Sequence, residues 1–239
     1  MIRQVFHTTK DYLDGFLNLI YPEHCDICYR ELTSQDKNIC FICKADLHYT
    51  YFEKYKESTK AQEVFWGRLN LEDVYSLLYY EKGNSTQRIL HHIKYRNGRN
   101  LGIFMGEIVG KKLLEIKSFQ TVDAIVPIPL HSKKEFQRGY NQSLLIAQGV
   151  QKSLQVPIID ALYRTKNDES QTRKSKEERY ENVKGKFALK EDKLKNNRHV
   201  LVVDDVLTTG ATLEFASRAI MEEQKNIKVS IATIAIADN

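Results

Sequence analysis

The chain has 239 residues, 42% of them hydrophobic, and a net charge of +5. This length allows one large domain, or one domain with a small appendage. No apolar run approaches the roughly 20 residues that a membrane-spanning helix needs. Asp11, Asp14 and Gly15 interrupt the segment where a secretory signal would lie. These features argue against a membrane span or a secreted protein and predict a cytoplasmic location.

The positive charge is concentrated in one stretch. Residues 131–200 contain 16 Lys and Arg against 9 Asp and Glu, a net charge of +7, so the whole excess lies there. Such a stretch suits an anionic partner, either a polyphosphate ligand or nucleic acid. The alternative is a solvated charged surface, which most charge runs are.

Helical and strand patterns alternate along the chain. An apolar repeat at helical spacing predicts a first helix over residues 12–20, and residues 50–70 predict a linker that packs onto the body. Strands are then predicted at 74–80, 124–127, 199–203 and 229–236, with an extended segment at 156–163. Helices are predicted at 85–95 (with Ser85 as the N-cap), 101–116, 141–150 and 213–224. Apolar strands separated by helices indicate an α/β fold with a mainly parallel sheet and helices on both faces.

Two CxxC pairs lie close together near the N-terminus. They comprise Cys25, Cys28, Cys40 and Cys43. Two such pairs close a tetrahedral sulfur site that suits structural zinc. The spacer is shorter than usual, so His24 and His48 are possible substitute ligands, and reduced or disulfide-bonded thiols are the alternative. We predict a helix and zinc-binding module over residues 1–60 and a larger domain over residues 61–239.

An acid pair and a threonine-rich turn follow the strand at 199–203. Asp204 and Asp205 come first, and the turn comprises Thr208, Thr209, Gly210, Ala211 and Thr212. In open α/β sheets ligands bind at the carboxyl ends of the strands, and amides at a helix start cradle phosphate. Carboxylates repel phosphate but accept hydrogen bonds from sugar hydroxyls, so the combination indicates a phosphorylated sugar. The alternative is that these acids and threonines only cap a helix and end a strand.

This run resembles the phosphoribosyl diphosphate (PRPP) motif of type I phosphoribosyltransferases, and every element of that motif is present. The resemblance implies that Asp204 and Asp205 hold the ribose hydroxyls and that residues 208–212 hold the 5′-phosphate. It also implies Mg²⁺, which enters with PRPP and neutralises the leaving pyrophosphate.

Two further segments resemble parts of a phosphoribosyltransferase site. The loop after the strand at 124–127 resembles the pyrophosphate loop; its candidate residues are Pro129, Leu130, His131, Lys133 and Arg138. The charged segment 165–182 resembles the mobile loop that closes over PRPP; its candidate residues are Gln171, Arg179 and Asn182. The alternatives are an ordinary exposed loop and a disordered surface loop.

The whole arrangement resembles the ComF family of competence proteins, from about residue 16 to 236. The cysteine pairs precede Ile93-Lys94-Tyr95, Val126 to Leu130, Arg138 to Gln142, and Asp204 to Thr212 in the family's order. The family implies a role in DNA uptake and natural transformation, with a DNA translocase as partner.

Three functions are compatible with these motifs. The first is a DNA-handling protein that binds PRPP with Mg²⁺ and binds single-stranded DNA through basic residues near Tyr95, namely Arg88, Lys94, Arg96 and Arg99. The second is an active phosphoribosyltransferase of nucleotide metabolism, similar to amidophosphoribosyltransferase but with no evident ammonia source. The third is an adaptor with a vestigial motif.

Overall fold

The computed structural model describes residues 22–33, 36–165 and 187–237. The chain forms two compact units, Met1–Leu47 and His48–Asn239. The helix predicted over residues 12–20 lies outside the described residues. Within the described part of the chain, no helix combines the length and the apolar character needed to cross a membrane.

The described part of the first unit, residues 22–33 and 36–47, is organised around its cysteines. A tight turn follows Cys25, whose carbonyl accepts a hydrogen bond from the Tyr29 amide at 2.9 Å, and the Cys25 amide donates to the Arg30 carbonyl at 2.8 Å. The short helix α2 (Phe41–Ala45) begins directly after Cys40 and carries Cys43. The turn and the helix together bring the two pairs of cysteines, Cys25 with Cys28 and Cys40 with Cys43, close to each other.

A four-stranded parallel sheet forms the centre of the second unit. The strand order is β1-β6-β5-β2, with β1 at Asp73–Tyr80, β2 at Ala124–Pro127, β5 at His199–Leu207 and β6 at Lys228–Ala237. In this register Pro127 at the end of β2 pairs with Val203 of β5. The segment after β2 and the acids after Val203 therefore meet at one edge of the sheet. The predicted parallel sheet is confirmed.

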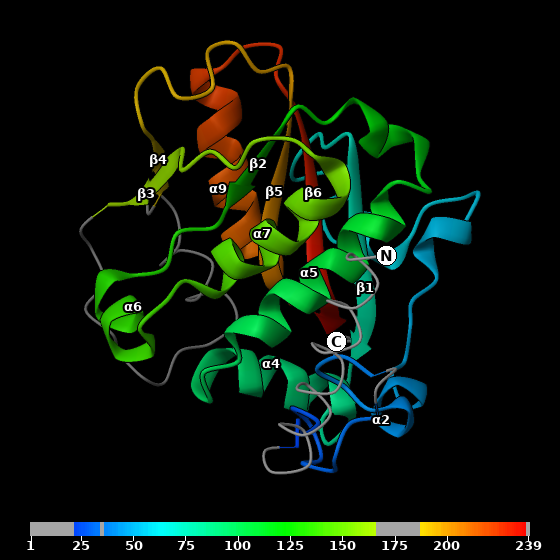
Figure 1. The fold of residues 1–239 in the computed structure, drawn as a ribbon. Helices are drawn as coiled ribbons and strands as arrows, with labels where there is room; N and C mark the ends of the chain where they lie inside the picture. The colour runs from blue at the N-terminus through cyan, green and yellow to red at the C-terminus, as the bar shows by residue number, and fades with distance from the viewer. Residues whose placement is uncertain (1–21, 34–35, 166–186, 238–239) are drawn as a thin grey trace, which may run out of the picture. The chain divides into compact units, whose positions relative to one another are not determined.

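Helices cover both faces of this sheet, as predicted (Figure 1). The long helices are α4 (Ser85–Tyr95), α5 (Arg99–Leu113), α7 (Gln142–Leu154) and α9 (Ala211–Glu223). Figure 1 shows α5 and α7 side by side on one face and α9 on the other. Helices α5 and α7 approach so closely that a Cβ atom at Gly106 would lie 2.1 Å from the Ile146 carbonyl oxygen. Glycine is therefore required at this crossing.

Short elements complete the second unit. They are η1 (Phe52–Lys54), α3 (Lys60–Glu63), η2 (Lys117–Thr121), α6 (Ser132–Arg138), β3 (Leu162–Arg164) and β4 (Phe187–Leu189). Strands β3 and β4 pair in antiparallel fashion and form a separate two-stranded ribbon. This ribbon frames one side of the pockets described below, through Arg164.

The structure differs from the sequence predictions at several element boundaries. Asn84, not Ser85, caps α4, because its side chain accepts a hydrogen bond from the Gln87 amide at 3.0 Å. The predicted linker over 50–70 contains η1 and α3, and Thr59 and Gln62 form a capping box at the start of α3. The predicted strand at 199–203 continues to Leu207, so the acid pair lies inside a strand.

Candidate ligand-binding site

Strand β5 presents the acid pair at the carboxyl edge of the sheet. Asp204 accepts two hydrogen bonds on Oδ1, from the Ser143 hydroxyl at 2.7 Å and from the Asp205 amide at 2.9 Å. Lys94, at the end of α4, places Nζ 2.8 Å from Oδ2 of Asp205. Asp204 is 8% exposed and Asp205 is 4% exposed, yet both line a pocket. These contacts fix the orientation of both carboxyl groups, which line the pocket where a ligand can bind.

The environment of Asp204 favours its protonated form. Burial raises the pKa of this carboxyl, and the nearby negative charge of Asp205 raises it further, to about 6. The hydrogen bonds from Ser143 and the Asp205 amide, and the charge of Lys94, oppose this shift. Asp204 therefore keeps its proton to a higher pH than an ordinary aspartate does.

The threonine turn leads from β5 into α9. Gly210 is the N-cap of α9 and has a φ of 77°, in the left-handed region that glycine adopts without steric cost. A Cβ atom there would lie 2.8 Å from Cγ1 of Val64 and 3.1 Å from Cε1 of Phe65. The turn therefore rests against residues 64–65. The first amides of a helix have no partner within the helix, and the helix dipole favours an anion beside them, so the start of α9 suits a phosphate group.

A buried ion pair holds the other side of the turn. Arg68 donates through Nη1 to the Thr209 carbonyl at 2.9 Å and through Nε to Oε2 of Glu214 at 2.9 Å. Glu214 lies in the first turn of α9 and is 0% exposed, and Arg218 also donates to it at 3.1 Å. The backbone of the turn is thus fixed by residues remote from the motif.

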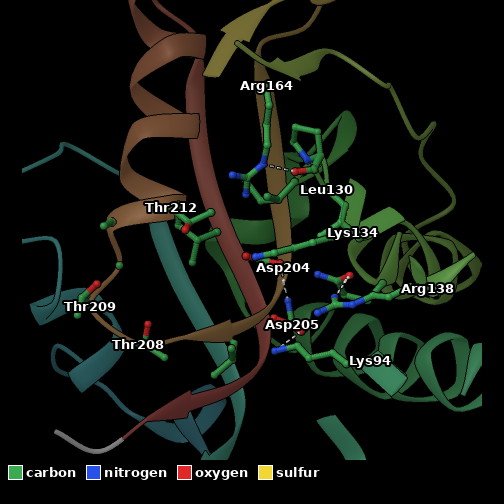
Figure 2. Close-up of a pocket in the computed structure, with 17 residues that line it drawn as sticks. Lys94, Leu130, Lys134, Arg138, Arg164, Asp204, Asp205, Thr208, Thr209 and Thr212 are labelled. Carbon is green, nitrogen blue, oxygen red and sulfur yellow. Dashed lines mark hydrogen bonds and ion pairs between the residues drawn. The ribbon is translucent and has the colours of Figure 1, made fainter. Parts of the chain in front are cut away.

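These parts surround one pocket of about 260 Å³ (Figure 2). The acids and the threonine turn form part of its wall, and Pro129 and Leu130 contribute after β2. Figure 2 shows Lys94, Lys134 and Arg138 reaching toward the acids from the side away from Thr208 and Thr209. The threonine turn, the two acids and a group of cationic side chains therefore line the same pocket.

Most of the residues predicted from the motif come together there. The lining residues that were predicted are Pro129, Leu130, Arg138, Asp204, Asp205, Thr208, Thr209, Gly210, Ala211 and Thr212. His131 instead lines a neighbouring pocket of about 440 Å³. Lys134, rather than the predicted Lys133, is among the described residues that line the site. Gln171, Arg179 and Asn182 lie outside the described residues.

The helical conformation of α6 explains why Lys134, and not Lys133, lines the pocket. We predicted an irregular basic loop, whereas residues 132–138 form α6. Side chains three and four apart lie on one face of a helix. Lys134 and Arg138 therefore point the same way, and Lys133 does not.

Besides Lys134, three more polar or charged residues that line the pocket are outside the predicted site set. In the sequence, Lys94 belongs to the Ile93-Lys94-Tyr95 motif and to the candidate DNA contacts, and Gln142 belongs to the Arg138 to Gln142 motif. Gln142 Oε1 accepts a hydrogen bond from Arg138 Nη1 at 2.7 Å. Arg164 donates through Nε to the Pro129 carbonyl at 2.9 Å and lies over the Phe187 ring. Arg164 had no signal in the sequence, since a single arginine at a strand end is common.

The four cysteine sulfurs of the first unit form a separate cluster. The group is Cys25, Cys28, Cys40 and Cys43, and all four sulfurs lie within 4.8 Å of one another. The Sγ atoms of Cys28 and Cys40 are 3.7 Å apart. Zinc–sulfur bonds of about 2.3 Å in a tetrahedron place sulfurs about 3.8 Å apart. The cluster is therefore compatible with structural zinc, and among the described residues it includes neither His24 nor His48.

The second unit is a phosphoribosyltransferase-type α/β domain. Residues 141–239, which include β5, the threonine turn, α9 and β6, match the phosphoribosyl transferase domain family.

Two of the similar proteins match about four fifths of the chain or more. It is 36% identical over 209 residues to competence protein F of Haemophilus influenzae, across 85% of this chain and 86% of the relative. The chain therefore belongs to the ComF family, as predicted. It is also 26% identical over 193 residues to DNA utilization protein YhgH of Escherichia coli, across 79% of this chain and 80% of the relative. Competence protein ComFC of Bacillus subtilis is 36% identical over 112 residues, across 46% and 43% of the two chains.

Proposed function

We propose that the second unit binds PRPP together with Mg²⁺. The observation that carries this proposal is that the acid pair and the threonine turn line one pocket with Lys94, Lys134 and Arg138. In this proposal residues 208–212 bind the 5′-phosphate, and Asp204 and Asp205 accept hydrogen bonds from the ribose hydroxyls. The cations bind the pyrophosphate. Carboxylate oxygens also suit Mg²⁺, which would neutralise the pyrophosphate charge in this pocket.

The cations of the pocket support a second candidate function, phosphoribosyl transfer. Transfer breaks the bond between the sugar C1 and pyrophosphate, and it depends on positioning and charge neutralisation more than on a protein acid or base. Arg138 and Arg164 are each held by a hydrogen bond, to Gln142 and to the Pro129 carbonyl, so their positions are set before a ligand arrives. An active phosphoribosyltransferase is therefore the second candidate function.

We further propose that the protein acts in the cytoplasm in DNA uptake and natural transformation. The names of the relatives, competence protein F and DNA utilization protein, support this role. The positive excess over residues 131–200 supports single-stranded DNA as a partner, and a DNA translocase is the expected protein partner. The cysteine cluster would hold zinc as a structural ion in the first unit, since its donor set leaves no open position.

Calorimetry with PRPP and Mg²⁺ tests the ligand. We expect the wild-type chain to bind PRPP and Asp204→Asn to bind it at least about tenfold more weakly, because one hydrogen-bond acceptor is lost. Asp192→Asn is the matched control, because Asp192 lies outside the pocket and its side chain is 76% exposed. If the wild-type chain gives no binding heat and no thermal shift with PRPP, the adaptor function replaces this proposal.

A pyrophosphate-release assay then separates a binding protein from an enzyme. An active transferase releases pyrophosphate from PRPP in the presence of Mg²⁺ and some amine or nucleobase acceptor. Replacement of Asp204 and Asp205 by alanine should abolish that release. PRPP binding without release for any acceptor would assign the site to ligand binding alone.

A further inference from the structure

A second compartment of about 300 Å³ adjoins the proposed PRPP pocket. The two compartments share Lys94, Lys134 and Arg138. Beyond these cations the second compartment is lined by Tyr95, Asn97, Gln137 and Tyr140. The three shared cations therefore form a common wall, with the acid pair and the threonine turn on one side and aromatic and amide side chains on the other.

The floor of this second compartment is held rigidly. Gly139 ends α6 with a φ of 73° and turns the chain so that Tyr140 becomes buried. The Tyr140 hydroxyl donates to the Ile93 carbonyl at 2.6 Å. Arg99 lies over the Tyr140 ring at 4.6 Å and donates to the Gly139 carbonyl at 2.7 Å. The ends of α4 and α6 are thereby tied together beneath the compartment.

The charges that face the second compartment are positive. Among the described residues that line it there is no acid. Lys94 is paired with Asp205 of the first pocket, whereas Arg138 donates to a neutral amide, that of Gln142. Lys134, which lines both compartments, adds a further positive charge. An anionic group placed here would be attracted by cations that the acid pair does not fully neutralise.

An exposed aromatic ring completes the compartment. Tyr95, the last residue of α4, is 64% exposed. The Arg138 guanidinium lies 5.1 Å from its ring centroid, and the His91 ring lies 5.0 Å away. Stacking of bases on aromatic rings beside a cationic track is the common way to bind single-stranded nucleic acid. The Asn97 and Gln137 amides can bond the edge of a stacked base.

We propose that this compartment binds one nucleotide unit of single-stranded DNA, with the base on Tyr95 and the phosphate on Lys134 and Arg138. The inference rests on the proposed function, because those two cations are also the proposed pyrophosphate contacts. It adds a regulatory consequence. PRPP with Mg²⁺ and DNA compete for the same cations, so each weakens the binding of the other by the same factor.

The first test removes the ring. Binding of a labelled oligodeoxythymidylate is measured by fluorescence anisotropy for the full chain, Tyr95→Ala, Tyr95→Phe and Phe136→Ala. Phe136 is the matched control, because it is 91% exposed on α6 itself but lines neither compartment. We expect Tyr95→Ala to weaken binding by about 5- to 100-fold, as loss of one stacking contact does, and Tyr95→Phe and Phe136→Ala to bind within about twofold of wild type. An equal loss for Phe136→Ala, or none for Tyr95→Ala, overturns the assignment.

The second test measures the competition. Saturating PRPP with Mg²⁺ at constant ionic strength should lower the DNA affinity, and Tyr95→Ala should keep the PRPP affinity of wild type. Unlabelled oligodeoxythymidylate, deoxythymidine monophosphate and inorganic phosphate are then compared as competitors of the labelled oligomer. Displacement of the label by the unlabelled oligomer or by the mononucleotide, but not by the same concentration of inorganic phosphate, supports a nucleotide compartment. Equal displacement by inorganic phosphate refutes the role of the Tyr95 ring.

The failures of the two proposals can be told apart. Wild-type protein that binds PRPP but no DNA, or that binds both without competition, overturns this inference and leaves the proposed function intact. Wild-type protein that binds DNA through Tyr95 but gives no response to PRPP overturns the PRPP assignment and the competition with it.

Discussion

Substitution of Gly210 by alanine separates backbone strain from steric overlap in the phosphate-binding turn. Gly67 provides the control, because its φ of 70° is close to the 77° of Gly210 while no atom lies within 4 Å of its Cβ position. At Gly210 the same atom would meet Val64 at 2.8 Å. Both substitutions place alanine in the left-handed region, at a cost of about 1–2 kcal/mol. Only Gly210→Ala adds overpacking, which costs about 1–3 kcal/mol more.

Urea unfolding of both variants measures these costs, and calorimetry measures PRPP affinity. Gly67→Ala should unfold with a free energy lower by about 1–2 kcal/mol and should bind PRPP like wild type. Gly210→Ala should lose about 2–5 kcal/mol and should bind PRPP more weakly, because the turn must move away from residues 64–65. Equal stabilities for the two variants would refute the close contact. Unchanged PRPP affinity in Gly210→Ala would refute the role of the turn.

Three further predictions concern the ion pair, the acid pair and the cysteines. Arg68→Met should lower the free energy of unfolding by about 2–4 kcal/mol, because the buried Glu214 carboxylate loses a partner that donates to it through both Nε and Nη2. Arg218→Met should cost less, because Arg218 donates to Glu214 through Nη2 at 3.1 Å, and the reverse order would contradict the contacts. Because the folded pKa of Asp204 is raised from 3.8 to about 6, stability should fall as pH rises between these values, and PRPP binding should strengthen up to about pH 7. Calorimetry across this pH range measures the PRPP affinity, and Asp204→Asn should remove the pH dependence of that affinity. Atomic emission should find one zinc ion per chain in the wild-type protein and none in Cys43→Ser. One zinc ion per chain in Cys43→Ser would exclude the cysteine cluster as the zinc site.

The parts of the site that lie close together in the sequence were predictable from it. The strand, the acids and the threonine turn follow one another within residues 199–212, so the pattern alone placed them at one sheet edge. Spacing likewise predicted that the four cysteines would gather. In both cases local geometry determines which side chains meet.

The remaining parts depend on contacts between distant segments. Arg68 reaches Glu214 across 146 residues, and nothing near Arg68 in the sequence marks it as a support for the turn. Lys94 meets Asp205 only because α4 ends beside β5. Helix α6 was missed because none of its residues is buried, so it has no apolar face for a periodic pattern to reveal. Tertiary packing, rather than local preference, determines the Arg68–Glu214 and Lys94–Asp205 contacts.

A crystal structure of the full chain, with PRPP and Mg²⁺ soaked into the crystals, is the decisive test of PRPP binding. We expect the 5′-phosphate on the amides and hydroxyls of residues 208–212, with the ribose hydroxyls within hydrogen-bond distance of Asp204 and Asp205. Density for PRPP elsewhere on the protein, or a sugar that leaves both carboxylates without contact, would contradict it.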